Sequence, residues 1–150
     1  MRRIFYGVIT AILLLLSRPG FGQESYSIID LGTLGGSSSS ANAINDSGQV
    51  VGSSTLTNGD TDAFLDNGSS MQDLGIGPLA GNFSTANSIN NLGQVVGDFF
   101  DATTEQTHAF LYSDGSVADL GTFGGYGSTA RGINDNGEIV GGYSPRYSQK

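Results

Sequence analysis

One segment of about 45 residues occurs three times along this chain, the third time only in part. Three motifs recur in the same order: Asp-Leu-Gly, Ala-x-x-Ile-Asn and Gly-x-x-Val-Gly. Their first residues are Asp30, Asp73 and Asp119; Ala41, Ala86 and Ala130; and Gly48, Gly93 and Gly137. We call the copies that contain Ala41, Ala86 and Ala130 unit 1, unit 2 and unit 3. Units of this kind bury their apolar faces against one another, and a period near 45 is typical of β-propeller blades and some solenoids.

Inside each unit the pattern predicts four antiparallel strands. Asn-Gly and Asp-Gly between apolar runs indicate hairpins, and no long stretch has helical periodicity. The predicted strands are 41–45, 49–53, 62–66 and 70–74 in unit 1, and 86–90, 94–99, 108–113 and 116–120 in unit 2. Residues 35–40 (Gly-Gly-Ser-Ser-Ser-Ser) are predicted to be a flexible connection. The chain also holds 24 glycines, which disfavour helices. The expected fold is therefore all-β, built from four-stranded antiparallel, blade-like units as an incomplete β-propeller-like array.

The apolar residues that recur between units are the predicted core. They are Ile44, Val50, Val51, Ala63, Phe64 and Leu74 in unit 1, and Ile89, Val95, Val96, Ala109, Phe110 and Leu120 in unit 2. The recurring alanine at the start of each unit indicates a close approach between neighbours.

The first 22 residues are typical of a signal peptide. Arg2 and Arg3 precede a thirteen-residue apolar run over 4–16, and the small residues Gly20 and Gly22 fit a cleavage site after Gly22. The apolar run is shorter than the roughly 20 residues of a membrane span. Cleavage would remove it, so we expect no membrane span in the cleaved protein; an uncleaved anchor is the alternative. The prediction is a secreted protein, extracellular or periplasmic, whose domain covers 23–150.

Charge and composition exclude several function classes. Residues 23–150 keep three basic residues against fourteen acidic ones, a net charge of −11. Nucleic-acid binding needs a basic surface, so it is not expected. The absence of cysteine excludes disulfides, thiol nucleophiles and cysteine-ligated metals.

A longer combination of motifs resembles a known family. It runs from His108-Ala-Phe-Leu-Tyr through Asp114-Gly and Asp119-Leu-Gly-Thr-Phe-Gly-Gly to Ala130-x-Gly-Ile-Asn-Asp-x-Gly-Glu-Ile-Val-Gly. This resembles the HAF repeat of probable extracellular bacterial proteins, over roughly residues 26–143. The resemblance implies a blade-like repeat and an extracellular location, and it implies no catalytic residue. Unit 1 departs from it, because Asp62 stands where the family has histidine.

His108 and the aspartates are the candidate chemical groups. Since no partner of His108 is fixed by spacing, a structural role is expected for this histidine. Asp60, Asp62, Asp98 and Asp101 lie in or beside the loops after the second strand of units 1 and 2. Such oxygen-rich loops suit calcium, the one cofactor considered, although Asp and Asn also form turns through their own backbone.

These observations favour a binding module over an enzyme. No catalytic constellation is apparent, so the predicted function is an extracellular or cell-surface interaction module whose ligand is an envelope component such as a glycan. One alternative is a carbohydrate-active enzyme that uses the loop aspartates as paired carboxylates. Another is a structural fragment of a longer repeat protein. Open strand edges also predict self-association.

Overall fold

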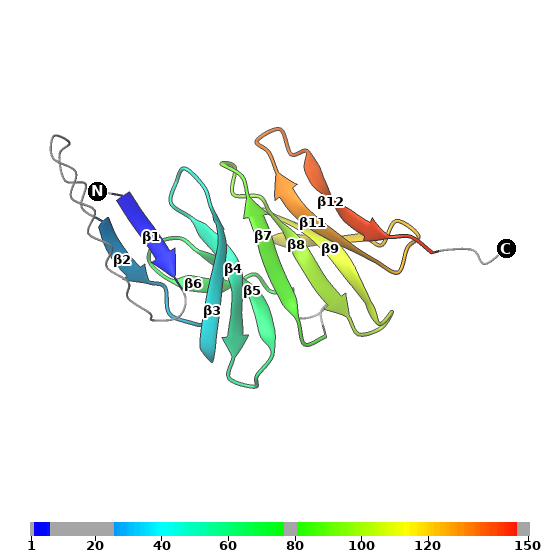
Figure 1. Ribbon diagram of the computed structural model, residues 1–150, viewed down its shortest axis with the longest axis horizontal. Helices are drawn as coiled ribbons and strands as arrows, with labels where there is room; N and C mark the ends of the chain where they lie inside the picture. The colour runs from blue at the N-terminus through cyan, green and yellow to red at the C-terminus, as the bar shows by residue number, and fades with distance from the viewer. Residues whose placement is uncertain (1, 7–25, 77–80, 147–150) are drawn as a thin grey trace, which may run out of the picture.

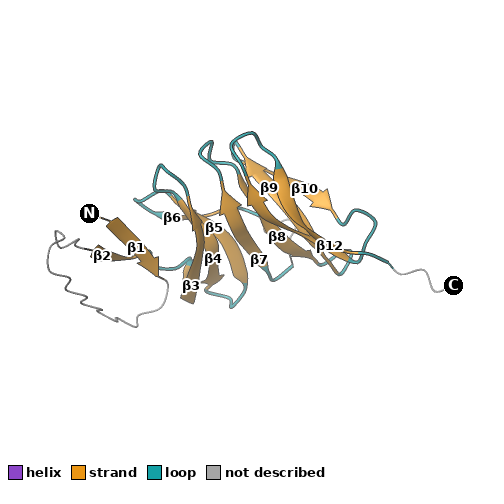
Figure 2. Ribbon diagram, turned by 45° about the horizontal axis from the view of Figure 1, so that its top comes forward, coloured by secondary structure: helices purple, strands orange, loops and turns teal. Residues whose placement is uncertain are grey.

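The computed structural model describes residues 2–6, 26–76 and 81–146, and all regular elements within these ranges are β-strands (Figure 1, Figure 2). The all-β prediction is therefore confirmed. The strands are β1 (Arg2–Tyr6), β2 (Tyr26–Asp30), β3 (Gly35–Ile44), β4 (Val50–Leu56), β5 (Thr61–Asp66), β6 (Met71–Asp73), β7 (Ser84–Ile89), β8 (Val95–Asp101), β9 (Gln106–Ser113), β10 (Ser116–Gly121), β11 (Gly127–Ile133) and β12 (Ile139–Ser144). In the described ranges no helix is long and apolar enough to cross a membrane.

The strands form three sheets. Strands β3, β4, β5 and β6 pair in chain order as one antiparallel sheet. Strands β7 to β10 follow the same antiparallel order, and β11 with β12 joins them through a parallel bridge between Gly127 and Thr107. Strands β1 and β2 form a separate parallel pair. The described strands do not close into a barrel or a propeller.

The hairpins β3–β4, β7–β8 and β11–β12 share one irregularity. In each, the register shifts directly after the recurring alanine. The residue opposite that alanine is Gly52, Gly97 or Gly141, and a Cβ atom there would lie 1.9–2.0 Å from a carbonyl oxygen of the facing strand. Only glycine fits this approach, which explains why the last glycine of the Gly-x-x-Val-Gly motif recurs.

The turns of these hairpins are built around the asparagine of the Ala-x-x-Ile-Asn motif. Asn45 Oδ1 accepts hydrogen bonds from the backbone N–H groups of Ser47 and Gln49, at 3.1 and 3.0 Å. Asn90 and Asn134 make the same two bonds in their own turns. The motif therefore encodes a turn in which the asparagine side chain replaces missing backbone partners.

The hairpins stack face to face. Strand β7 packs across β3, β4 and β5, and β11 packs across β7, β8 and β9. One apolar cluster, which includes Val51, Ile89 and Phe110, lies between units 1 and 2. A smaller one, formed by Val96, Ala109 and Ala130, lies between units 2 and 3.

Two details differ from the sequence prediction. Residues 35–40 are not a flexible connection: they form the first half of β3, where the Ser38 N–H donates to Thr55 Oγ1 at 3.0 Å. The serine-rich composition indicated a loop, but serine side chains and their backbone groups form hydrogen bonds in a strand pair as well as in a loop. In the predicted core, Ile44 is 51% exposed and Leu120 is partly buried, whereas the other ten residues are buried.

Most of the predicted leader lies outside the described residues. Its start, Arg2–Tyr6, is strand β1 and pairs in parallel with β2 (Tyr26–Asp30). The predicted cleavage point after Gly22 falls in the range 7–25, outside the residues that the structure describes.

Candidate functional site

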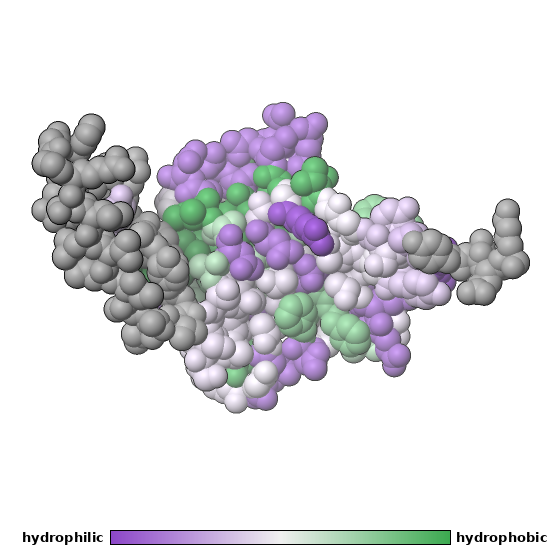
Figure 3. Space-filling view, viewed as in Figure 1, coloured by the Kyte–Doolittle hydropathy of each residue, from purple (hydrophilic) through white to green (hydrophobic). Residues whose placement is uncertain are grey.

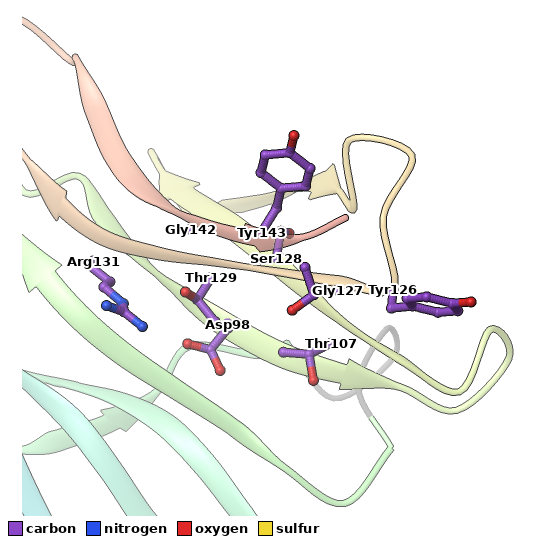
Figure 4. Close-up of a pocket in the computed structure, with 10 residues that line it drawn as sticks. Asp98, Thr107, Tyr126, Gly127, Ser128, Thr129, Arg131, Gly142 and Tyr143 are labelled. Carbon is purple, nitrogen blue, oxygen red and sulfur yellow. The ribbon is translucent and has the colours of Figure 1, made fainter. Parts of the chain in front are cut away.

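A groove opens between units 2 and 3, with a volume of about 490 Å³ (Figure 4). Strands β8 and β9 form one wall, and strands β11 and β12 form the other. The lining side chains are mostly polar or aromatic: Asp98, Thr107, Tyr126, Ser128, Thr129, Arg131, Tyr143 and Ser144, with the glycines Gly127 and Gly142. Strand β11 pairs with β9 through the bridge between Gly127 and Thr107, and both of these residues line the groove.

Asp98 and Arg131 supply opposite charges to this groove. Asp98 Oδ1 accepts a hydrogen bond of 2.8 Å from Asn87 Nδ2, which fixes the carboxyl group. Burial raises the pKa of Asp98, and the Asn87 bond and the positive charge of Arg131 oppose that rise. The groove thus presents a strong acceptor beside a five-donor guanidinium group.

Two tyrosines border the groove, and their rings point away from Asp98 and Arg131 (Figure 4). Tyr126 is 61% exposed and Tyr143 is 57% exposed. Arg146 stacks over the ring of Tyr126, 5.5 Å from its centroid. Their rings offer apolar faces with a hydroxyl at one end, which suits partners that are amphipathic themselves.

The repeat register points to Arg131, although the sequence prediction missed this residue as well as Tyr126 and Tyr143. Arg131 stands where units 1 and 2 have Asn42 and Asn87. Both asparagines donate from Nδ2 to a backbone carbonyl of the following unit, at 2.8 and 2.9 Å. A position that changes in only one copy is a signal of a role other than holding the repeat together.

His108 has partners that its sequence position did not reveal. It is 8% exposed, its Nδ1 lies 2.9 Å from Asp119 Oδ2, and its Nε2 lies 3.2 Å from Thr104 Oγ1. The Thr104 hydroxyl donates to Asp101 Oδ2 at 2.8 Å. Phe99 covers the ring at 5.6 Å between centroids. His108 therefore joins the strand pair β9–β10 to the loop before β9.

Asp62 occupies the corresponding place in unit 1, and its surroundings are different. Its Oδ1 lies 3.4 Å from the Ser84 hydroxyl, and the side chain of Asp73 lies where unit 2 has Asp119. Burial raises the pKa of Asp62, and the neighbouring carboxylates of Asp73 and Asp60 raise it further. Two carboxyl groups thus stand where unit 2 pairs an imidazole with a carboxylate.

The four calcium candidates lie in four different environments. Asp62 belongs to the carboxyl pair just described, and Asp98 lines the groove. Asp60 is held in its own loop, where its Oδ2 accepts from Asn58 Nδ2 at 2.6 Å. Asp101 accepts from the Thr103 N–H and the Thr104 hydroxyl, which lower its pKa. Across residues 2–6, 26–76 and 81–146, no three acidic or histidine side chains form a metal-binding group.

Comparison of the chain with family models, curated proteins and solved structures gives no match. The resemblance to the HAF repeat stays a prediction made from the motifs. The geometry of the groove and of the His108 cluster is therefore the basis for any functional argument.

Proposed function

We propose that this protein is an exported binding module, and that the groove between units 2 and 3 holds a hydroxyl-rich ligand, with an extracellular glycan as the best fit. The units act as blade-like elements of an incomplete, propeller-like array, in keeping with the HAF-repeat resemblance. The protein binds without turnover. The observation that carries the proposal is the placement of Asp98, Arg131 and two threonines together in one groove that two exposed tyrosines border (Figure 4).

The chemistry of the groove matches that of a sugar. A carboxylate accepts hydrogen bonds from neighbouring hydroxyls, whereas a guanidinium group donates to sugar and carboxylate oxygens. Exposed aromatic rings pack against the apolar faces of sugar rings while their own hydroxyls stay in water. Thr107 and Thr129 add further donors and acceptors along the floor. An apolar ligand would leave these polar groups without partners, at a cost in affinity.

The predicted export fits the same ligand class. A leader cleaved after Gly22 would place the acidic domain outside the cytoplasm, where polysaccharides are abundant. Because the domain lacks a basic surface, a strongly anionic polymer such as a nucleic acid is a poor fit. Arg131 lies beside Asp98, so the pair offers the groove little net charge.

A glycan array followed by calorimetry tests the proposal. The informative variant is Arg131→Asn, because units 1 and 2 carry asparagine at this position and the fold accepts it. We expect it to weaken binding of the best glycan by at least about tenfold, the loss of one good charged hydrogen-bonding group. Tyr126→Ala is expected to weaken it by a similar factor.

Asp114→Asn is the matched control, since Asp114 is exposed in the β9–β10 turn and lies outside the groove. Its affinity should equal that of the unaltered chain. Equal binding by Arg131→Asn and Tyr126→Ala would place the ligand elsewhere. No glycan bound by the folded chain would reject the proposal.

A further inference from the structure

The junctions between neighbouring units use the same hydrogen bonds twice. Asn45 Nδ2 donates to the backbone oxygen of Asn90 at 3.1 Å, and Asn90 Nδ2 donates to that of Asn134 at 2.9 Å. The Asp46 N–H donates to Asn91 Oδ1 at 2.9 Å, and the Asn91 N–H donates to Asp135 Oδ1 at 2.8 Å. In these four bonds, each unit donates to the unit that follows it and accepts from the unit before it.

Apolar burial follows the same direction. Val51 and Val96 face a following unit and are 0% exposed, whereas the corresponding Val140 of unit 3 is 67% exposed. Ile89 faces a preceding unit and is 7% exposed, whereas the corresponding Ile44 of unit 1 is 51% exposed. The difference comes from neighbours and not from residue type, because all five residues are aliphatic and β-branched.

The two end faces thus carry the two halves of one junction. The leading face, formed by Ile44, the Asn45 carbonyl and Asp46, offers the acceptors. The trailing face, formed by Asn134, the Asp135 N–H and Val140, offers the donors. Asn134 Nδ2 already bonds Glu138 Oε2, as Asn45 and Asn90 bond Gln49 and Gln94. Asn45 and Asn90 also donate a hydrogen bond from Nδ2 to the following unit. In unit 3, the corresponding bond of Asn134 is available to a second copy of the chain.

We propose that a second copy of this chain docks its leading face on the trailing face of the first, head to tail, in the geometry that joins units 1, 2 and 3. Such a contact joins two different surfaces, so each dimer keeps one free face of each kind and can add further copies. Strands β1 and β2 lie beside β3 (Figure 1), and Ile44 is half exposed in their presence. In the view of Figure 3, apolar patches lie among polar and neutral residues on the described part of the surface.

One feature weakens the docked junction relative to the internal ones. Within the chain, Asn91 Nδ2 lies between two carboxylates, 2.9 Å from Asp46 Oδ2 and 3.1 Å from Asp135 Oδ2. Between copies, Asp135 meets Asp46 with no asparagine between them, and two like charges repel. The association is therefore weaker than the internal stacking, and salt strengthens it by screening.

Sedimentation velocity over a range of concentrations, on the chain expressed from its full sequence, tests this geometry. The average mass should rise with concentration. Asp46→Asn recreates the Asn91 arrangement and should tighten association by roughly tenfold. Val140→Asp and Ile44→Asp should each abolish association. Leu92→Asp places the same charged residue at a 69% exposed position in the β7–β8 turn and should leave association unchanged.

Mixing two variants separates head-to-tail docking from every other mode. Val140→Asp keeps a working leading face and Ile44→Asp keeps a working trailing face, so each alone should be monomeric and their mixture should form dimers and nothing larger. Thermal melts check that both variants are folded. Association that survives Val140→Asp, or a mixture that stays monomeric while the unaltered chain associates, would overturn the proposal. So would a monomer at all concentrations in both the unaltered chain and Asp46→Asn.

Discussion

The strand pairs β5–β6 and β9–β10 have the same frame and different buried polar groups. Phe64 lies opposite Asp73 in the first pair, and Phe110 lies opposite Asp119 in the second. Both phenylalanines are 0% exposed. Two residues before them, unit 1 has Asp62 and unit 2 has His108. The recurring apolar and glycine residues hold the frame, and this leaves the buried polar position free to differ.

The largest effect should come from the shared frame. Phe64→Ala and Phe110→Ala should each lower the free energy of unfolding by about 3–5 kcal/mol, because each leaves a cavity in a fully buried site. The milder Phe→Leu changes keep the chain folded enough to measure. Urea unfolding of the matching variants at Phe64 and Phe110 should give losses in unfolding free energy that agree within about 1 kcal/mol. A small loss at only one of the two sites would show that the two frames are not equivalent.

The buried polar position should separate the two strand pairs through pH. The folded chain holds the proton of Asp62 at a higher pH than the unfolded chain does, since burial and Asp73 raise the pKa of Asp62 above 3.8. The contribution of this group to stability is complete below pH 3.8 and is lost as the pH rises through the raised value. Asp62→Asn removes that loss. The variant should therefore gain stability over the unaltered chain at pH 7 and show little difference near pH 3.

A companion variant sharpens the result. Asp62→His gives unit 1 the imidazole–carboxylate pair of unit 2, and it should raise the free energy of unfolding at pH 7 by about 1 kcal/mol, the net contribution of one hydrogen bond. Asp114→Asn, which removes an exposed carboxylate from a turn, is the control for general charge effects. Thermal melts at pH 3 and pH 7 make the measurement, and a gain for Asp62→Asn that is equal at both pH values would contradict it.

The hairpins of this fold could be predicted because their signals are local. Asn-Gly, Asp-Gly and the Asn-x-x-Gly turns specify a reversal within a few residues, and the observed strands follow them closely. The exposure of Ile44 could not be read from the repeat, because periodicity treats all copies alike whereas burial depends on which neighbour is present. The same reasoning applies to Val140, for which only the stacking order explains why a valine of the motif lies in solvent.

The functional candidates could be predicted in part. The sequence identified Asp98 and His108 as polar positions, but it did not identify their partners. Asp119 reaches His108 through the β9–β10 pairing, whose register shifts between Asp119 and Gly121. Arg131 meets Asp98 only because unit 3 stacks on unit 2. A comparison of the three copies would have found Arg131 as a departure, yet the groove itself depends on contacts between units.

The smallest effect concerns the loop before β9, where Thr104 contacts the buried His108 of unit 2. The pKa of Asp101 is lowered by the Thr103 N–H and by the Thr104 hydroxyl, which also touches His108. Thr104→Val removes one of these donors, so the pKa of Asp101 should rise towards its ordinary value and the His108 ring signals should shift. Thr103→Val is the matched control, because it keeps the backbone donor and should change neither. Carboxyl and imidazole NMR titrations measure both groups, and an unchanged Asp101 in Thr104→Val would show that the loop and the histidine are not coupled.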